Sequence, residues 1–166
     1  MWRSEIAATV DGETPSVLCH PIRVILDPFL DIPPAANIKQ TANQYRTIIF
    51  YNKQIEKSTD WETKNRDIEY IPTSAHEEYL DIEEILLKLG ELKILSVLVE
   101  SGPMLSSHLL KTKNVNRLYY FISPKIIGGT KNVYNNLNIF KLEEHIKLKN
   151  TNIEIINDDI LYIGDL

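Results

Sequence analysis

The sequence predicts an α/β fold whose sheet is mainly parallel and ends in an antiparallel hairpin. Two observations carry this prediction. First, apolar runs of strand length alternate with stretches of helical periodicity, which is typical of parallel sheets covered by helices. Second, the last apolar runs, 146–156 and 160–163, flank the turn-forming residues Asn157-Asp158-Asp159. Because the chain has 166 residues and 43% hydrophobic content, we expect one domain over residues 1–166.

The first strands are read from uninterrupted apolar and β-branched residues. Residues 21–27 form such a run, which stops at a turn signal, and residues 46–51 repeat its character. Strands of this kind are buried on both faces. A shorter candidate covers residues 68–71 and ends before Pro72. The polar stretch 52–67 is either a solvated connection or an exposed helix.

A helix is predicted from Leu80 to about Leu92 because the apolar residues there fall on one stripe, at Ile82, Ile85, Leu86 and Leu89. Asp81 is placed to cap its first turn. Glu84 follows three residues later and would complete a capping box.

The most informative segment is a strand at residues 94–99, the turn Glu100-Ser101-Gly102-Pro103, and a helix from Pro103 to about Lys111. The amide groups and the dipole at a helix N-terminus attract phosphate, so this turn can cradle one. Glu100 ends the strand on the rim where open α/β sheets bind ligands. The alternative is a plain tight turn with a surface carboxylate. Another strand is expected at residues 115–123.

Composition excludes several classes of protein. The net charge is −5 and no block of basic residues occurs, so we expect neither nucleic acid nor anionic lipid as a partner. The longest apolar run, 94–99, is far shorter than a membrane span. Cys19 is the single cysteine and the histidines lack metal-ligand spacing, so we expect no disulfide, no metal and a cytoplasmic location.

Three segments, in order, resemble one family: residues 89–105, then Val115-Asn116-Arg117-Leu118-Tyr119, then Ser123-Pro124-Lys125-Ile126-Ile127-Gly128-Gly129. They are similar to the C-terminal reductase domain of the bifunctional riboflavin-biosynthesis deaminase/reductases. Residues 21–27 resemble an earlier strand of that domain, and residues 157–162 resemble its final hairpin. The resemblance implies a dihydrofolate-reductase-like three-layer fold.

The resemblance also implies a reaction. NADPH would deliver hydride to C1 of the open-chain ribose of 5-amino-6-(5-phosphoribosylamino)uracil and give the ribityl product, with no metal. Glu100 would contact this phosphorylated pyrimidine substrate. Pro28 occupies a position near the cofactor that the family often fills with Ser. The turn and the first helical residues would receive the cofactor through Gly102, Pro103, Met104, Leu105, Ser106 and Ser107.

Residues 9–20 align without gaps on a family segment of the form Thr-Val, two residues, Asp, any residue, Pro, any residue, Leu, two residues, Arg. By this resemblance Thr9 and Glu13 would contact the cofactor, and Val17 and His20 the substrate. Glu13 replaces the family's Asp, and His20 replaces an Arg that would pair with the substrate phosphate. An imidazole lacks the bidentate fork of a guanidinium.

The family's first strand and its zinc-binding deaminase domain have no counterpart in the sequence. We therefore expect a reductase-like domain that lacks its N-terminal strand. The chain is either a truncated reductase or a degenerate, non-catalytic relative that serves as a binding or structural module. An unrelated nucleotide-binding α/β domain is disfavoured because no Gly-any-Gly-any-any-Gly follows a strand. A homodimer stays open, since dimers are common in the resembling family.

Two backbone conformations are predicted. Lys93 stands where the family has Gly, so it would adopt a left-handed conformation. The peptide before the turn glycine is often cis in the resembling fold, so Ser101-Gly102 is predicted to be cis or otherwise strained.

Overall fold

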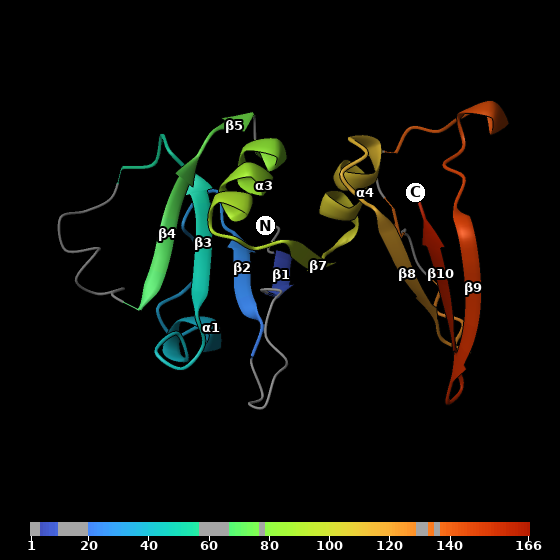
Figure 1. The fold of residues 1–166 in the computed structure, drawn as a ribbon, viewed down its shortest axis with the longest axis horizontal. Helices are drawn as coiled ribbons and strands as arrows, with labels where there is room; N and C mark the ends of the chain where they lie inside the picture. The colour runs from blue at the N-terminus through green and yellow to red at the C-terminus, as the bar shows by residue number, and fades with distance from the viewer. Residues whose placement is uncertain (1–3, 10–19, 57–66, 77–78, 129–132, 135–136) are drawn as a thin grey trace. The chain divides into compact units, whose positions relative to one another are not determined.

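The described residues form a five-stranded sheet, a three-stranded sheet and a short two-stranded sheet (Figure 1). The structure, a computed structural model, describes residues 4–9, 20–56, 67–76, 79–128, 133–134 and 137–166. The chain divides into two units, Met1–Gly102 and Pro103–Leu166, and each unit is described by itself. In the described part of the chain, no helix combines the length and the apolar composition needed to span a membrane.

The five-stranded sheet of the first unit has the order β4-β3-β2-β1-β7. Parallel ladders join β2 to β3 and β3 to β4, whereas β1 is antiparallel to both β2 and β7. All strands except β1 therefore run in one direction, which confirms the mainly parallel sheet. The sequence analysis missed β1. The strands are β1 (Ser4–Thr9), β2 (Ile22–Leu26), β3 (Thr47–Asn52), β4 (Ile68–Thr73) and β7 (Ser96–Glu100).

Both faces of β2 and β3 are buried, as their uninterrupted hydrophobicity predicted. Ile25 and Ile49 pack with Ile32 and Ala42 from the segment around α1 (Asn37–Gln40). The alternate residues of β2 and β3 point to the other face, which α3 (Ile82–Glu91) covers (Figure 1). The first unit is thus a helix–sheet–helix sandwich, and its most buried side chains include Val24, Ile48, Phe50, Ile85 and Leu89.

Asp81 caps helix α3 as predicted, and the helix begins at Ile82, but the capping box does not form. The Asp81 carboxylate accepts a hydrogen bond from the Glu84 amide at 3.0 Å. The Glu84 carboxylate instead accepts from the amide of Ser74, because the Asp81 amide is already bonded to the Ser74 carbonyl. A short β5–β6 hairpin (Ala75–His76 and Tyr79–Leu80) precedes the helix. At its other end Lys93 has φ 61°, so the left-handed prediction is confirmed.

Strand β4 continues through Pro72 to Thr73, so the predicted end before the proline was wrong. Proline lacks a donor for the ladder and is tolerated only where no neighbour needs one. In the described part of the chain β4 is an edge strand that pairs with β3 alone. The unpaired outer side of β4 therefore tolerates a residue without an N–H.

Strand β7 forms the other edge of this sheet and pairs, among the described residues, with β1 only. Unlike the side chains of β2, Leu98 is 51% exposed and the preceding Leu95 is 70% exposed. The apolar side chains of β7 are thus left without cover in the described structure.

The second unit holds α4 and a three-stranded antiparallel sheet in the order β8-β10-β9. Helix α4 (Pro103–Lys111) has the predicted bounds. The hairpin of β9 (Lys149–Ile156) and β10 (Asp159–Asp165) is confirmed, and Asn157 takes φ 55° in its turn. The hairpin pairs with β8 (Arg117–Ile122) in a sheet of its own. A single 3-10 turn, η1 (Leu142–Glu144), precedes β9.

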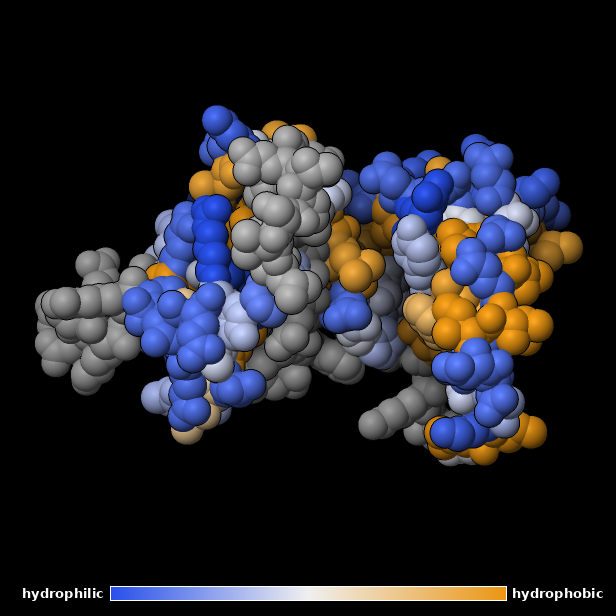
Figure 2. Space-filling view, turned by 60° about the horizontal axis from the view of Figure 1, so that its bottom comes forward, coloured by the Kyte–Doolittle hydropathy of each residue, from blue (hydrophilic) through white to orange (hydrophobic). Residues whose placement is uncertain are grey.

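One face of the second sheet is apolar and exposed. Ile122, Ile160 and Ile155 are paired across the three strands in one row and are 45%, 42% and 78% exposed. Ile153 lies two residues along β9 on the same face and is 63% exposed. Figure 2 shows hydrophobic side chains gathered over this part of the chain, on the right of the view.

Candidate functional site

The carboxyl ends of the parallel strands gather several predicted site residues at one edge of the first sheet. Strand register sets this arrangement, because Glu100 pairs with Glu5 and Glu5 pairs with Ile25, next to the last residue of β2. Glu100, the last residue of β7, and Pro28, in the turn after β2, therefore lie at the same edge of the sheet. Ligands of open α/β sheets bind beyond this edge.

Asp27 and Pro28 are fixed by the turn that follows β2. Asp27 is buried, and its carboxylate accepts hydrogen bonds from the amides of Asp31 at 3.0 Å and Ile32 at 3.1 Å. The Pro28 carbonyl accepts from the Asn52 amide at 3.1 Å, which ties this turn to the end of β3. Burial, and then the negative charge of Asp27, raise the pKa of Tyr70 to about 12, so the phenol stays neutral.

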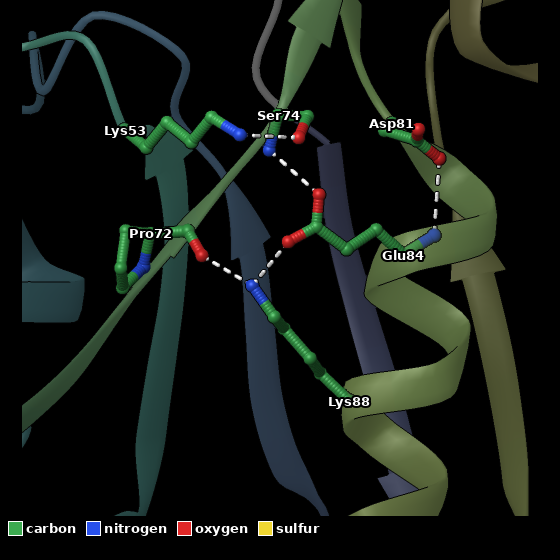
Figure 3. Close-up of polar contacts among 6 residues, drawn as sticks. All are labelled: Lys53, Pro72, Ser74, Asp81, Glu84 and Lys88. Atoms are coloured by element: carbon green, nitrogen blue, oxygen red, sulfur yellow. Dashed lines mark hydrogen bonds and ion pairs between the residues drawn. The ribbon is translucent and has the colours of Figure 1, made fainter.

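A polar cluster occupies the ends of β3 and β4 (Figure 3). Lys53 Nζ donates to the Ser74 hydroxyl at 3.0 Å. The Ser74 amide donates to Glu84 Oε2 at 2.8 Å, and Lys88 Nζ donates to Glu84 Oε1 at 2.5 Å and to the Pro72 carbonyl. The Lys88 bond first, and then the Ser74 amide, lower the pKa of Glu84 to about 2. Glu84 is therefore ionised at every physiological pH.

The sequence analysis missed this cluster, since Lys53 and Ser74 fall in or beside stretches that seemed only to connect elements. A signal was present nonetheless. Each of the two is the first residue after a parallel strand, and β3 and β4 are neighbours. The first residues after adjacent parallel strands are brought together by the sheet itself.

The predicted turn follows β7 as expected, with Glu100 as the last residue of the strand and Pro103 as the first of α4. Glu100 is exposed and Gly102 is half-buried. No cis peptide bond occurs among the described residues, so the predicted cis peptide between Ser101 and Gly102 was wrong. The division between the two units falls after Gly102, and Glu100 is therefore described apart from the residues of α4.

Within α4, the predicted cofactor residues differ in their exposure. Pro103, Met104, Leu105 and Ser106 are half-buried. Ser107 is buried, and its hydroxyl donates to the Pro103 carbonyl at 2.6 Å. A hydroxyl proton engaged in this way is not offered to a ligand, so a cofactor contact by Ser107 would require its side chain to turn.

Thr9 and His20 lie at the opposite end of the first sheet, where the parallel strands begin. Thr9 pairs with Ser96, the first residue of β7, four residues and about 13 Å along the strand from the pair of Glu5 and Glu100. His20 precedes β2, and its ring meets that of Tyr45 edge-on with centroids 4.6 Å apart. The structure therefore does not bring these two residues together with Glu100. Glu13 and Val17, predicted to bind cofactor and substrate, lie outside the described residues.

Arg23 is the guanidinium nearest in sequence to His20, but the donors on its Nη1 and Nη2 are engaged. They bond the hydroxyls of Thr41 and Thr47 and the carbonyls of Ile38, Thr41 and Tyr45. Arg23 thus anchors the segment around α1 to the sheet. Arg23 therefore does not take over the role of the family arginine whose position His20 occupies.

Comparison with known proteins agrees with this fold. The family described as the RibD C-terminal domain matches residues 2–162. The chain belongs to this family. A riboflavin biosynthesis protein RibD from Actinobacillus pleuropneumoniae is 32% identical over 145 residues, covering 86% of the chain and 38% of that protein. A 5-amino-6-(5-phosphoribosylamino)uracil reductase from Buchnera aphidicola is 28% identical over 148 residues, covering 87% of the chain and 67% of that reductase.

Solved structures of RibD proteins share the fold. RibD of Acinetobacter baumannii superposes with a TM-score of 0.70 at 17% identity, over 86% of the chain and 36% of that protein. A riboflavin biosynthesis reductase of Saccharomyces cerevisiae gives 0.68 at 18% identity, over 89% of the chain and 70% of that protein. The dihydrofolate-reductase-like fold is therefore confirmed. The chain spans about two fifths of the length of the first RibD relatives it matches.

Proposed function

We propose that this RibD C-terminal domain is an NADPH-dependent reductase that converts the ribosyl group of 5-amino-6-(5-phosphoribosylamino)uracil to a ribityl group. The observation that carries the proposal is the edge of the first sheet at which the parallel strands end. Glu100 and Pro28 both lie at this edge, in a member of this family. Sheets of this type bind nucleotides and their substrates at such an edge.

Glu100 in the first unit and the start of α4 in the second unit each suit one chemical group of these ligands. Glu100 is exposed, so its carboxylate can accept hydrogen bonds from ribose hydroxyls or pyrimidine N–H groups. The same charge would repel a phosphate. Phosphate instead suits the amide groups at the start of α4, which follow Gly102 directly. NADPH supplies the hydride in this chemistry, and the protein supplies binding and orientation.

A binding and turnover measurement on the whole chain tests the proposal. We expect calorimetry to detect NADPH binding, and we expect oxidation of NADPH to follow addition of the ribosylamino-pyrimidine. A well-folded chain that binds no NADPH at millimolar concentration would refute the proposal while leaving the fold intact.

A second candidate function is a binding or structural module without catalysis. His20 favours it, since an imidazole replaces the arginine that the resemblance pairs with the substrate phosphate, and Arg23 is engaged elsewhere. This candidate predicts NADPH binding without turnover, and His20→Arg would then restore part of the substrate affinity. Turnover by the unaltered chain would exclude it.

The proposed partner of the second sheet is another copy of the chain. Its support is the apolar row of Ile122, Ile160 and Ile155, which leaves three isoleucines exposed on one flat face. A two-fold dimer would place this face against itself. Sedimentation should show a dimer that Ile155→Lys converts to a monomer. A monomeric unaltered chain would refute this partner.

A further inference from the structure

The turn after β2 contains a residue in an unfavourable backbone conformation. Leu30 has φ 57°, a left-handed value that residues with a Cβ disfavour. Its side chain is half-buried and packs against the cluster of Ile25 and Ile49. A conformation of this kind persists only where the surrounding contacts fix it, and such residues gather at ligand-binding sites.

The Asp27 carboxylate supplies contacts that fix Leu30. It is buried, and its two oxygens accept hydrogen bonds from the two amides that directly follow Leu30. Oδ1 accepts from Asp31 at 3.0 Å and Oδ2 accepts from Ile32 at 3.1 Å. The Asp27 carbonyl accepts from the Leu30 amide at 3.2 Å. One side chain therefore holds the backbone on the far side of Leu30, and it needs both of its oxygens to do so.

Both ends of the turn are tied to the first sheet. The Asp27 amide and the Pro28 carbonyl are bonded to the backbone of β3 at 2.9 and 3.1 Å. Ile32, 3% exposed, belongs to the core cluster. The residues between these anchors, 29–31, are exposed or half-buried. Their shape therefore depends on the Asp27 carboxylate more than on packing.

We propose that Asp27 is a positioning residue of the reductase, whose carboxylate keeps the turn after β2 in the shape that receives NADPH beside Pro28. The inference rests on the proposed function, in which Pro28 is a predicted cofactor contact. Asp27 is buried, so it acts through the turn rather than by touching the cofactor. A turn that is already ordered adds no ordering cost to binding, whereas a turn with several shapes lowers the apparent affinity by the fraction in the competent shape.

Two variants disturb this device from opposite sides. Asp27→Asn keeps the size of the side chain but replaces one acceptor oxygen by a donor group. Leu30→Ile leaves Asp27 intact and keeps the apolar volume, but a β-branched residue resists a positive φ more strongly than leucine does. Asp158→Asn is the matched control, since Asp158 is an exposed aspartate in the hairpin turn of the second unit.

Calorimetry measures NADPH binding to the whole chain and to each variant, and steady-state kinetics separates the KM for NADPH from kcat. Urea unfolding and the hydrogen exchange of the Asp31 and Ile32 amides report the stability of the fold and of the turn without any ligand. We expect Asp27→Asn to weaken NADPH binding about ten-fold, as for a turn that keeps its shape in about one molecule in ten.

The KM for NADPH should rise in Asp27→Asn while kcat at saturating NADPH stays unchanged, because bound cofactor selects the competent turn. Leu30→Ile should shift the affinity and the KM in the same direction. Asp158→Asn should bind NADPH like the unaltered chain. If Asp27→Asn does not fold, Leu30→Ile decides the question alone.

A merely structural role gives a different result. The urea midpoint would fall and the amides of Asp31 and Ile32 would exchange faster, but folded Asp27→Asn and Leu30→Ile would bind NADPH like the unaltered chain. That result overturns the inference and leaves the proposed function standing. Failure of the proposed function is recognised separately, because the unaltered chain would then bind no NADPH, and the inference would fall with it.

Discussion

Replacing Glu84 by Gln should destabilise the first unit by about 1 kcal/mol at neutral pH. The Glu84 carboxylate accepts from Lys88 at 2.5 Å and from the Ser74 amide at 2.8 Å. An exposed i,i+4 ion pair contributes about 0.3 to 0.5 kcal/mol, and a hydrogen bond to a charged group contributes somewhat more than a neutral one. The side chain is 31% exposed, so solvent screening keeps the sum near this value and below the roughly 3 kcal/mol that an unscreened lowering of the Glu84 pKa to about 2 would carry.

The pH dependence of this loss follows from the lowered pKa of Glu84, about 2 in the folded protein against about 4.3 in an unfolded chain. A carboxyl group whose pKa is lowered by folding stabilises the fold above its unfolded pKa. That stabilisation is lost as the pH falls toward the folded pKa. The difference between the unaltered chain and Glu84→Gln should therefore be constant above about pH 5 and shrink between about pH 4 and pH 2.

Urea unfolding followed by circular dichroism, repeated between pH 7 and pH 3, measures this difference. Glu83→Gln is the matched control, since Glu83 is an exposed carboxylate in the same helical turn. Titration of the Glu84 carboxyl carbon by NMR gives the pKa directly. A midpoint near 4, or a loss of stability that does not change with pH, would refute the reasoning.

The other predictions concern the turn and the hairpin. Glu100→Gln should weaken substrate binding and leave NADPH affinity nearly intact, as measured by calorimetry with each ligand. For Gly102→Ala, the free energy lost from NADPH binding should exceed the free energy lost from folding. An NADPH affinity equal to that of the unaltered chain would contradict this prediction. Gly164→Ala should destabilise the second unit by about 1 to 3 kcal/mol, because the new Cβ would lie 2.8 Å from Leu148 Cβ. Chemical denaturation measures this loss, and the loss should be smaller in a Leu148→Gly chain, which lacks that Cβ.

The parts of the fold that could be predicted are those that local chemistry decides. Proline at the first helical turn and the apolar strand before it gave α4 its observed bounds. Lys93 in place of a family glycine indicated the left-handed residue after α3. Each of these depends on a few neighbouring residues, whose preferences act in the same direction as the packing.

The parts that could not be predicted depend on strand partners. Strand β1, with the short sequence Ser-Glu-Ile-Ala-Ala-Thr, carries too few β-branched residues to be recognised alone, and it forms because β2 and β7 pair with it on both sides. Glu84 does not form the predicted capping box for the same kind of reason, since its carboxylate accepts a hydrogen bond from the Ser74 amide at the end of β4. The polar cluster around Lys53 likewise exists only once β3 and β4 are neighbours.

The edge of β7 has no partner strand among the described residues, and this has a consequence for what can bind there. A strand edge offers a row of amide and carbonyl groups, and the segment Ser96–Glu100 contains no lysine or proline that would discourage pairing. Leu98 beside this edge adds apolar surface. Among the described residues, this side of β7 therefore keeps main-chain donors and acceptors that another strand could pair with. A segment that occupies the edge of β7 would block such pairing.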